Sequence, residues 1–436
     1  MPLEKKFLDE DVYEPVPKKA RSSWCSFLAI FMGMWASLAA IGVGISIGQA
    51  ITPWKGALAL FLGYMVCLVY GFLIGDIGRK EGLSTYPLLG RPFSRFWKIL
   101  PSFFTFFIAA VFIGVQADAV ARVIMSVIGW EITSIGAITN RAIFSAALCA
   151  VMMITAYKGF RYIKTVSWVA MPIFMSILII GLVLGIGSYP GGLSAILTEE
   201  AHAMNFSSVF FLGVALYAGF SAMLPDVSRY VSSRRDLIKV CVIGYVVSAF
   251  IPIWGVIVGS IYGIVYWKIF SVYGITFGVI SAMALYLAQW TTNDNNAFTS
   301  GLALSTFFRT LKDKWERVPR LDRRYATLVP ATFGTILAFL GTGAIEPLVM
   351  FVSALGSWLP TMGGVMIAHF YVVERRKRKI EAKGLAGIIS WVTISLLVQL
   401  GVMPYAGIMG ILGAFLLYLV LYYGIEKPIF GENVIG

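Results

Sequence analysis

The feature that most constrains this chain is a series of long apolar runs that continues along nearly its whole length. Each run has roughly 20 residues, enough for a helix to cross the hydrocarbon core of a membrane. Of the 436 residues, 58% are hydrophobic and 13% are charged, whereas a soluble protein carries about 25% charged residues. The short alternating strands of a membrane barrel are missing from the sequence. The chain is therefore predicted to be an all-α integral membrane protein, with its backbone groups bonded inside helices.

The apolar runs between clusters of charge predict about twelve transmembrane helices. They lie near 24–50, 55–76, 99–126, 141–157, 165–188, 206–228, 237–264, 271–306, 326–342, 346–373, 384–402 and 404–424. The first ten divide into two five-helix repeats, 24–188 and 206–373, and two additional helices follow over 384–424. An odd number of helices in each half means that the two repeats insert with opposite orientation. The segments 1–23 and 425–436 are predicted to be cytoplasmic tails.

The distribution of basic residues tests this arrangement. With both termini in the cytoplasm, the predicted inner segments hold 31 of the 35 lysines and arginines, and the outer loop 189–205 holds none. This positive-inside asymmetry predicts a multi-pass protein of the plasma (cytoplasmic or inner) membrane with cytoplasmic termini. It also explains the net charge of +13 without a nucleic-acid partner. The lipid bilayer is the expected partner, and no obligate protein partner is evident.

Two predicted helices, the first and the sixth, contain residues that weaken a helix. The first contains Gly33 and the glycine-rich stretch 42–48, and the sixth contains Gly213, the stretch 217–221 and then Pro225. Glycine interrupts a helix cheaply, and proline removes a backbone donor. Close packing of helices through small residues explains each segment alone equally well. Since the two helices take corresponding places in the two repeats, we expect discontinuous helices around a site near the middle of the membrane.

Six consecutive polar residues, Thr291 to Asn296, interrupt the apolar sequence of the predicted eighth helix. Such a run is expensive against lipid and should face protein, water or an ion. Hydroxyl and carbonyl oxygens are hard ligands that suit a cation such as sodium. Amide side chains both donate and accept hydrogen bonds, so they can recognise the edge of a heterocycle. A hydrogen-bond network between helices remains the structural alternative, above all for Asp294 and Asn296.

Other polar residues in apolar segments are candidates for gating or coupling. Asp118 and Arg122 lie four residues apart on the predicted third helix and are expected to pair, with a coupling role for Asp118 left open. Gln116 on the same helix is a candidate for the substrate pathway. Asp226 and Arg229, at the inner end of the sixth helix, would serve as a gate or cap, or simply as an anchor.

Little in the sequence points to an enzyme. No HExxH motif is present, the pattern GxSxG occurs once, as Gly44 to Gly48 inside the apolar first helix, and the two histidines lie far apart in the sequence. The four cysteines have no metal-ligand spacing and are predicted to be buried free thiols: Cys25, Cys67, Cys149 and Cys241. No organic cofactor is expected.

Four motifs, in chain order and spread over most of the chain, carry a resemblance to a known family. They are Gly75-Asp76-Ile77-Gly78 with Lys80 and Gly82-Leu83-Ser84-Thr85, then Asp226-Val227-Ser228-Arg229, Trp290-Thr291-Thr292-Asn293-Asp294-Asn295 and Gly363-Gly364-Val365-Met366-Ile367-Ala368. With these motifs the chain resembles the nucleobase–cation symporters, in particular their cytosine permease branch. The resemblance implies the LeuT-like fold, a five-plus-five inverted repeat with two further helices. It also implies secondary active transport.

The resemblance assigns a coupling ion, Na⁺, to the place where the interrupted first helix meets the eighth. The backbone carbonyls of Gly33, Ala36 and Ala288 would bind it together with the hydroxyls of Thr291 and Thr292. The hydroxyl oxygens of these two threonines predict the same cation-binding role independently of the resemblance.

The resemblance places the nucleobase between aromatic side chains of the third and sixth helices, here Phe112 and Tyr217. The backbone around Gly219 and the amide of Asn293 would recognise its polar edge. Stacking would supply much of the affinity, and hydrogen bonds would select the ring.

The chain departs from the cytosine permeases at the substrate site. Their base-reading glutamine on the third helix corresponds to Ala109, and Gln116 lies about two turns further along. Their tryptophan corresponds to Phe112, and their sixth-helix phenylalanine corresponds to Tyr217. The substrate is therefore left open between a pyrimidine, a purine and a related planar heterocycle such as a hydantoin or a vitamin precursor. A symporter of the same fold for amino acids or amines, and a proton-coupled nucleobase permease, are the alternative functions.

Overall fold

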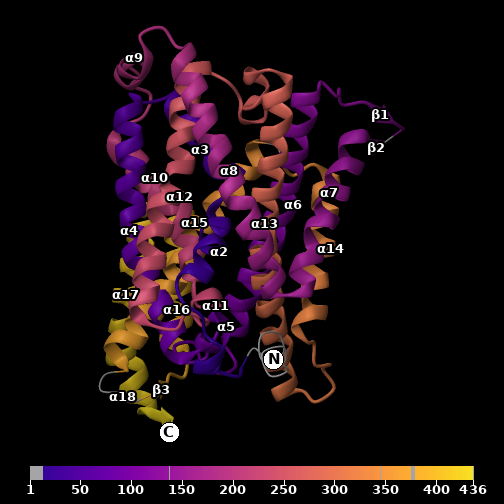
Figure 1. The fold of residues 1–436 in the computed structure, drawn as a ribbon. Helices are drawn as coiled ribbons and strands as arrows, with labels where there is room; N and C mark the ends of the chain where they lie inside the picture. Colours follow the sequence, from indigo (N-terminus) through magenta and orange to yellow (C-terminus); the bar gives the residue numbers. More distant parts are fainter. Residues whose placement is uncertain (1–12, 137, 344, 375–378, 436) are drawn as a thin grey trace.

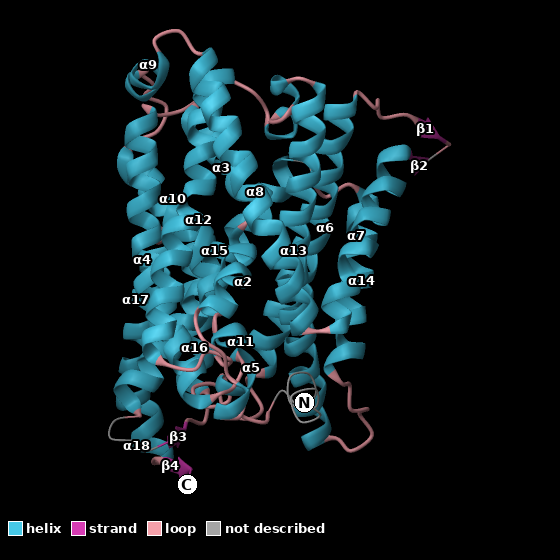
Figure 2. Cartoon of the chain, viewed as in Figure 1, coloured by secondary structure: helices cyan, strands magenta, loops and turns pink. Residues whose placement is uncertain are grey.

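The structure is a computed structural model, and it describes residues 13–136, 138–343, 345–374 and 379–435. Much of the predicted tail 1–23 and the basic cluster 375–378 of a predicted inner loop lie outside the described residues. The described chain is almost entirely helical, with two short antiparallel strand pairs, β1 with β2 and β3 with β4 (Figure 2).

The elements follow one another along the chain with short connections. In order they are η1 (Lys18–Ala20), α2 (Cys25–Trp35), α3 (Leu38–Gly48), α4 (Pro53–Glu81), α5 (Thr85–Leu88), α6 (Ile99–Ile128), β1 (Ser134–Ile135), β2 (Ile138–Thr139), α7 (Asn140–Lys158), α8 (Phe160–Ser188), α9 (Gly192–Thr198), α10 (Phe206–Ala222), α11 (Pro225–Ser228), α12 (Arg234–Tyr262), η2 (Tyr266–Lys268), η3 (Ser271–Tyr273), α13 (Ile275–Lys314), α14 (Arg323–Leu340), α15 (Ile345–Ala368), η4 (His369–Val373), β3 (Lys379–Glu381), α16 (Leu385–Gln399), α17 (Ala406–Leu421), η6 (Tyr422–Glu426), α18 (Lys427–Phe430) and β4 (Asn433–Ile435).

The long helices run side by side as one bundle, and each of the twelve predicted spans coincides with a helix or a pair of helices (Figure 1). Among the described residues, seven helices are long and apolar enough to cross a membrane, or eight if the bent pair α2 and α3 forms one span. The apolar helices α10 and α16 are shorter. The hairpin β1–β2 and α9 lie at one end of the bundle, and the strand pair β3–β4 lies at the other (Figure 1). This architecture confirms the predicted all-helical membrane fold.

The first span is broken, as predicted. Helix α2 ends at Trp35, α3 begins at Leu38, and the two axes are bent by 57°. Ser37 between them is extended, and its hydroxyl accepts a hydrogen bond from the N–H of Ala39 at 3.2 Å. Small residues before the glycine-rich stretch thus form the break, whereas residues 42–48 are continuous helix.

The glycines of this stretch serve helix packing instead. A Cβ atom on Gly44 would lie 2.1 Å from the carbonyl oxygen of Pro252, and one on Gly48 would lie 1.9 Å from that of Val256. On the facing helix α12, Gly255 and Gly259 approach the backbone of α3 equally closely. Each helix therefore presents a pair of glycines four residues apart, the spacing that lets two membrane helices touch along their backbones.

The sixth span is also discontinuous, as predicted. Helix α10 ends at Ala222, and α11 begins at Pro225, whose fixed φ suits the first turn of a helix. The segment 217–221 lies inside α10, so the break comes about one turn later than its glycine. Hence Gly219 lies in the last turn of a helix, where carbonyls lose their intrahelical donors.

Three helix boundaries and the exposure of one cysteine differ from the sequence predictions. Helix α8 begins at Phe160 and passes through Pro172 rather than beginning near residue 165. Helix α13 begins only after Gly274, which has a φ of 81°, and continues to Lys314. Cys25 is exposed, whereas the other three cysteines are buried, and all four are free.

The contact between α3 and α12 gives a stability prediction. Gly48→Ala is expected to lower the free energy of unfolding by about 2 kcal/mol, because its Cβ would overlap the backbone of α12. Gly42→Ala is the matched control in the same helix, since its Cβ would lie at an ordinary 3.5 Å from the Cβ of Tyr266. Thermal unfolding of the two purified variants checks the difference. Equal melting temperatures would contradict the packing role.

Candidate functional site

Five oxygen atoms converge where the end of α2 meets the middle of α13. We call them the oxygen cluster: the carbonyls of Gly33, Ala36 and Ala288 and the hydroxyls of Thr291 and Thr292. The hydroxyl of Thr292 lies 2.8 Å from the carbonyl of Gly33, 3.3 Å from that of Ala36 and 3.5 Å from that of Ala288. The hydroxyl of Thr291 lies 3.2 Å from the carbonyl of Gly33 and 2.7 Å from that of Ala288. The structure thus brings together all five residues predicted to bind a cation.

The chemistry of the oxygen cluster suits a cation. Two hydroxyl hydrogens face three carbonyl oxygens, so the cluster holds more lone pairs than hydrogens. Gly33 and Ala36 lie at the C-terminal end of α2, where the helix dipole concentrates negative charge. Gly33 is required for the approach, since a Cβ there would lie 2.7 Å from the Thr291 hydroxyl. A hard monovalent ion could be bound here once the hydroxyls turn their hydrogens outward.

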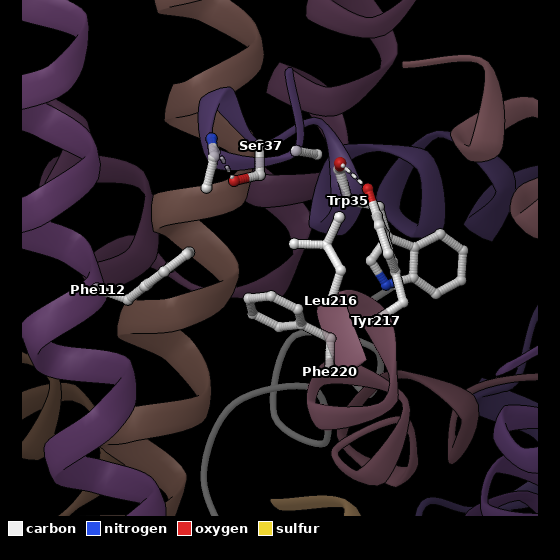
Figure 3. A pocket seen from close by; sticks show the side chains of 8 residues that line it. Trp35, Ser37, Phe112, Leu216, Tyr217 and Phe220 are labelled. Atoms are coloured by element: carbon white, nitrogen blue, oxygen red, sulfur yellow. Dashed lines mark hydrogen bonds between the residues drawn. The ribbon is translucent and has the colours of Figure 1, made fainter. Parts of the chain in front are cut away.

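A small cavity lies beside the break of the first span, between α2, α3, α6 and α10 (Figure 3). Its lining is chiefly aromatic and aliphatic: Trp35, Ser37, Ala39, Ala40, Phe112, Leu216, Tyr217 and Phe220. The rings of Phe112 and Phe220 meet edge to face, with centroids 5.8 Å apart and planes at 62°. The hydroxyl of Tyr217 donates to the carbonyl of Trp35 at 2.9 Å (Figure 3). An apolar cavity with a few fixed polar groups is the usual form of a small-molecule site.

The structure brings some of the predicted substrate residues to this cavity and not others. Phe112 and Tyr217 line it from α6 and α10. Gly219 is next to the lining residue Phe220, and the N–H of Met223 bonds the carbonyl of Phe220 rather than that of Gly219. Gly219 itself does not line the cavity.

Ala109, Gln116 and Asn293 are buried but do not line the cavity. The amide nitrogen of Asn293 donates to the carbonyl of Ile113 at 3.2 Å and lies 3.3 Å from the sulfur of Met152, while its oxygen has no partner among the described residues. Both polar atoms of Gln116 are likewise buried without a partner in the described chain. Burying an amide unpaired is costly, so these atoms are available to a ligand or to water.

Asp118 is the centre of a buried ionic network. Its carboxylate accepts hydrogen bonds from Arg122 at 3.0 Å, from Ser145 at 2.8 Å and from the N–H of Gly343 at 2.9 Å, and it also pairs with Arg141. The predicted pair with Arg122 is confirmed. The additional bonds join α6 to α7 and to the segment before α15, and they satisfy the carboxylate fully.

Asp226 and Arg229 lie just after the break of the sixth span. The carboxylate of Asp226 accepts the N–H of Thr85 and the hydroxyl of Thr299, each at 2.9 Å, and thereby joins α11 to α5 and α13. The guanidinium of Arg229 donates to the hydroxyl of Tyr230 at 2.8 Å. Both side chains are buried, so they hold the helix end in place and are not exposed anchors.

Asp294 is held by hydrogen bonds to α7. Both of its carboxylate oxygens lie 2.7 Å from the hydroxyl of Thr155, and it also accepts the backbone N–H of Ala156. The Thr155 hydroxyl in turn accepts the indole N–H of Trp290 at 2.7 Å. Within the described part of the chain, no ion pair includes Asp294. The one acidic residue of the polar run therefore joins α13 to α7.

Several residues of the site were not predicted from the sequence. Trp35 and Ser37 lie at the break, and Gln289 lies two residues before the polar run. Their positions next to the predicted break and the predicted polar run could have identified them. Leu216 and Phe220 line the cavity as ordinary apolar residues of α10, and nothing in the sequence distinguishes them.

The chain is similar to known permeases over nearly its whole length. The family of permeases for cytosine/purines, uracil, thiamine and allantoin matches residues 15–420. The cytosine permease of Escherichia coli (strain K12) is 23% identical over 416 residues, which cover 93% of each chain. The permease of Escherichia coli O157:H7 is similar to the same extent.

Solved structures of similar fold are transporters. Mhp1, a nucleobase-cation-symport-1 family transporter in a closed conformation with bromovinylhydantoin bound, aligns with a TM-score of 0.76 at 16% identity over 96% of each chain. A Na⁺-coupled sialic acid symporter in a substrate-bound outward-open state aligns with a TM-score of 0.71 at 14% identity, over 99% of this chain and 95% of the other. These alignments confirm the LeuT-like fold.

The contact between Thr155 and Asp294 gives a second prediction. Thr155→Val removes the hydroxyl that lies against both carboxylate oxygens and leaves the backbone bond from Ala156, and the loss of one hydrogen bond to a buried carboxylate costs about 2 kcal/mol. We expect a clear loss of thermal stability. Asp294→Asn added to Thr155→Val should recover part of the loss, because the amide carries no charge. A double variant no more stable than Thr155→Val would show that the charge is not the cause.

Proposed function

Because the chain belongs to the family of permeases for cytosine/purines, uracil, thiamine and allantoin, we propose that it imports a nucleobase or a related planar heterocycle together with sodium. It is a transporter and not an enzyme, as predicted. The observation that carries the sodium proposal is the convergence of the oxygen cluster across the break of the first span.

The oxygen cluster supports sodium as the coupled ion. Its donors are all oxygens, three of them carbonyls, which suit a hard cation of low charge. Two of those carbonyls come from α2 and the third from α13, so a bound ion would fasten the broken helix to the middle of α13. Ion binding would then favour the conformation that holds substrate, and substrate would favour ion binding by the same factor.

The aromatic cavity supports a planar heterocycle as substrate. Phe112 enters it from α6, and Tyr217 and Phe220 enter it from α10 (Figure 3). A flat ring held between such side chains gains stacking energy in a site with little water. The unpaired amide atoms of Gln116 and Asn293 on the neighbouring helices are the groups we propose for its polar edge.

The backbone at the break argues against an amino-acid substrate. A carboxylate would need free N–H groups at the start of α3, but these are already taken. The N–H of Leu38 bonds Gln289, that of Ala39 bonds the Ser37 hydroxyl, and those of Ala40 and Ile41 bond the carbonyl of Ser37.

We propose that the two five-helix segments, 24–188 and 206–373, move against each other to open the site to either side of the membrane. The oxygen cluster and the cavity both lie between residues of the two segments. Following the charge asymmetry, we propose that the end of the bundle with β3–β4 faces the cytoplasm, together with both termini (Figure 1).

The ion assignment predicts that Thr292→Ala weakens sodium binding about tenfold, the effect of losing one ligand worth roughly 1.4 kcal/mol. The measurement is sodium-dependent nucleobase binding by purified protein across a series of sodium concentrations. Thr165→Ala is the matched control, since among the described residues that hydroxyl bonds the carbonyl of Arg161 in its own helix, α8. Stimulation by protons in place of sodium would instead favour a proton-coupled permease.

Binding of radiolabelled nucleobases with and without sodium tests the function itself. The wild type should bind a nucleobase or hydantoin more tightly with sodium and should not bind amino acids. Asn293→Ala is expected to abolish binding, because it removes the amide proposed for the polar edge, while thermal unfolding shows an intact fold. Normal binding by that variant would make the site assignment wrong, and a response to amino acids alone would overturn the substrate class.

A further inference from the structure

Gln289 joins the two parts of the proposed site through one buried hydrogen bond. Its side-chain oxygen accepts the N–H of Leu38, the first residue of α3, at 2.9 Å. Because a backbone N–H can only donate, this bond fixes which end of the amide faces α3. The first N–H groups of a helix have no partner within the helix. Because of the break, the N–H of Leu38 has no partner within its own helix. Gln289 on α13 provides that partner.

The bond between Gln289 and Leu38 lies next to both parts of the proposed site. On α13, Gln289 directly follows Ala288, whose carbonyl belongs to the oxygen cluster. At the break, Leu38 lies between Ser37 and Ala39, which both line the cavity. One bond therefore lies between the place proposed for the ion and the wall of the place proposed for the substrate.

The rest of the Gln289 side chain is not otherwise engaged. The residue is fully buried, and its amide nitrogen has no hydrogen-bond partner in the described chain. An unpaired buried donor lowers stability. Replacing the amide by a side chain of similar length without polar atoms would remove one bond and one unpaired group together. Such a replacement should change the break while sparing the fold.

We infer that Gln289 is a positioning residue that transmits ion binding to the substrate cavity. An ion in the oxygen cluster holds α2 against α13, and the Gln289–Leu38 bond then sets the start of α3, with Ser37 and Ala39 in place to complete the cavity. Without the bond, ion binding would no longer change the affinity for the substrate, and substrate binding would no longer change the affinity for the ion. This inference rests on the proposed sodium-coupled function.

The test compares the ratio of nucleobase dissociation constants without and with saturating sodium. Gln289→Met, of similar length, should bring this ratio close to one, whereas the wild type keeps a large ratio. Gln289→Glu retains an oxygen that accepts the Leu38 N–H and should restore most of the ratio. Gln49→Met is the matched control at the other end of α3, where the side chain bonds one partner among the described residues, the carbonyl of Ile264.

Hydrogen exchange of the peptide around Leu38 gives a second readout, which a general loss of stability would not reproduce. Gln289→Met should accelerate exchange at Leu38 while peptides from α12 keep their wild-type rates. An unchanged ratio in Gln289→Met, or wild-type exchange at Leu38, would overturn the inference. If the wild type itself bound no nucleobase or showed no effect of sodium, the proposed function would fail instead, so the two failures are distinct.

Discussion

A break in a helix inside a membrane leaves backbone groups without partners, and lipid cannot supply any. The groups freed between α2 and α3 find theirs on two other helices. Tyr217 of α10 donates to the carbonyl of Trp35, Gln289 of α13 accepts from Leu38, and the threonines of the oxygen cluster face the carbonyls at the end of α2. The position of α10 and α13 around the break follows from this requirement, because a shift of either helix would leave a buried polar group unpaired.

The opposite side of the break is held in another way. Helix α3 touches α12 along backbone surfaces, through Gly44 and Gly48 on one side and Gly255 and Gly259 on the other. Such contacts are close and apolar, so they position α3 without directing hydrogen bonds. In contrast, few polar contacts join α3 to α13. A helix that is firmly packed on one face and held by single hydrogen bonds at its end can respond to what binds beside that end.

The buried aspartates show how differently one residue type is accommodated. Asp118 is surrounded by two arginines, a hydroxyl and a backbone N–H, while Asp226 accepts one hydroxyl and one backbone N–H. Asp294 accepts the hydroxyl of Thr155 and the backbone N–H of Ala156. Each aspartate links its own helix to another element, so each contributes to the arrangement of the bundle. A buried carboxylate is costly in a membrane unless such partners surround it.

The sequence by itself determined the membrane environment, the number and order of the spans and the weakened first and sixth helices, because hydropathy, glycine and proline act locally. It also identified the threonines of the oxygen cluster, since a run of six polar side chains in an apolar helix is costly against lipid. Only the tertiary structure decided that the glycines of residues 42–48 pack against α12, that Asp294 faces α7, and that Gln289 reaches Leu38. Each of these contacts depends on which helix lies opposite. The residues near a position in the sequence do not indicate a partner that is more than a hundred positions away in the chain.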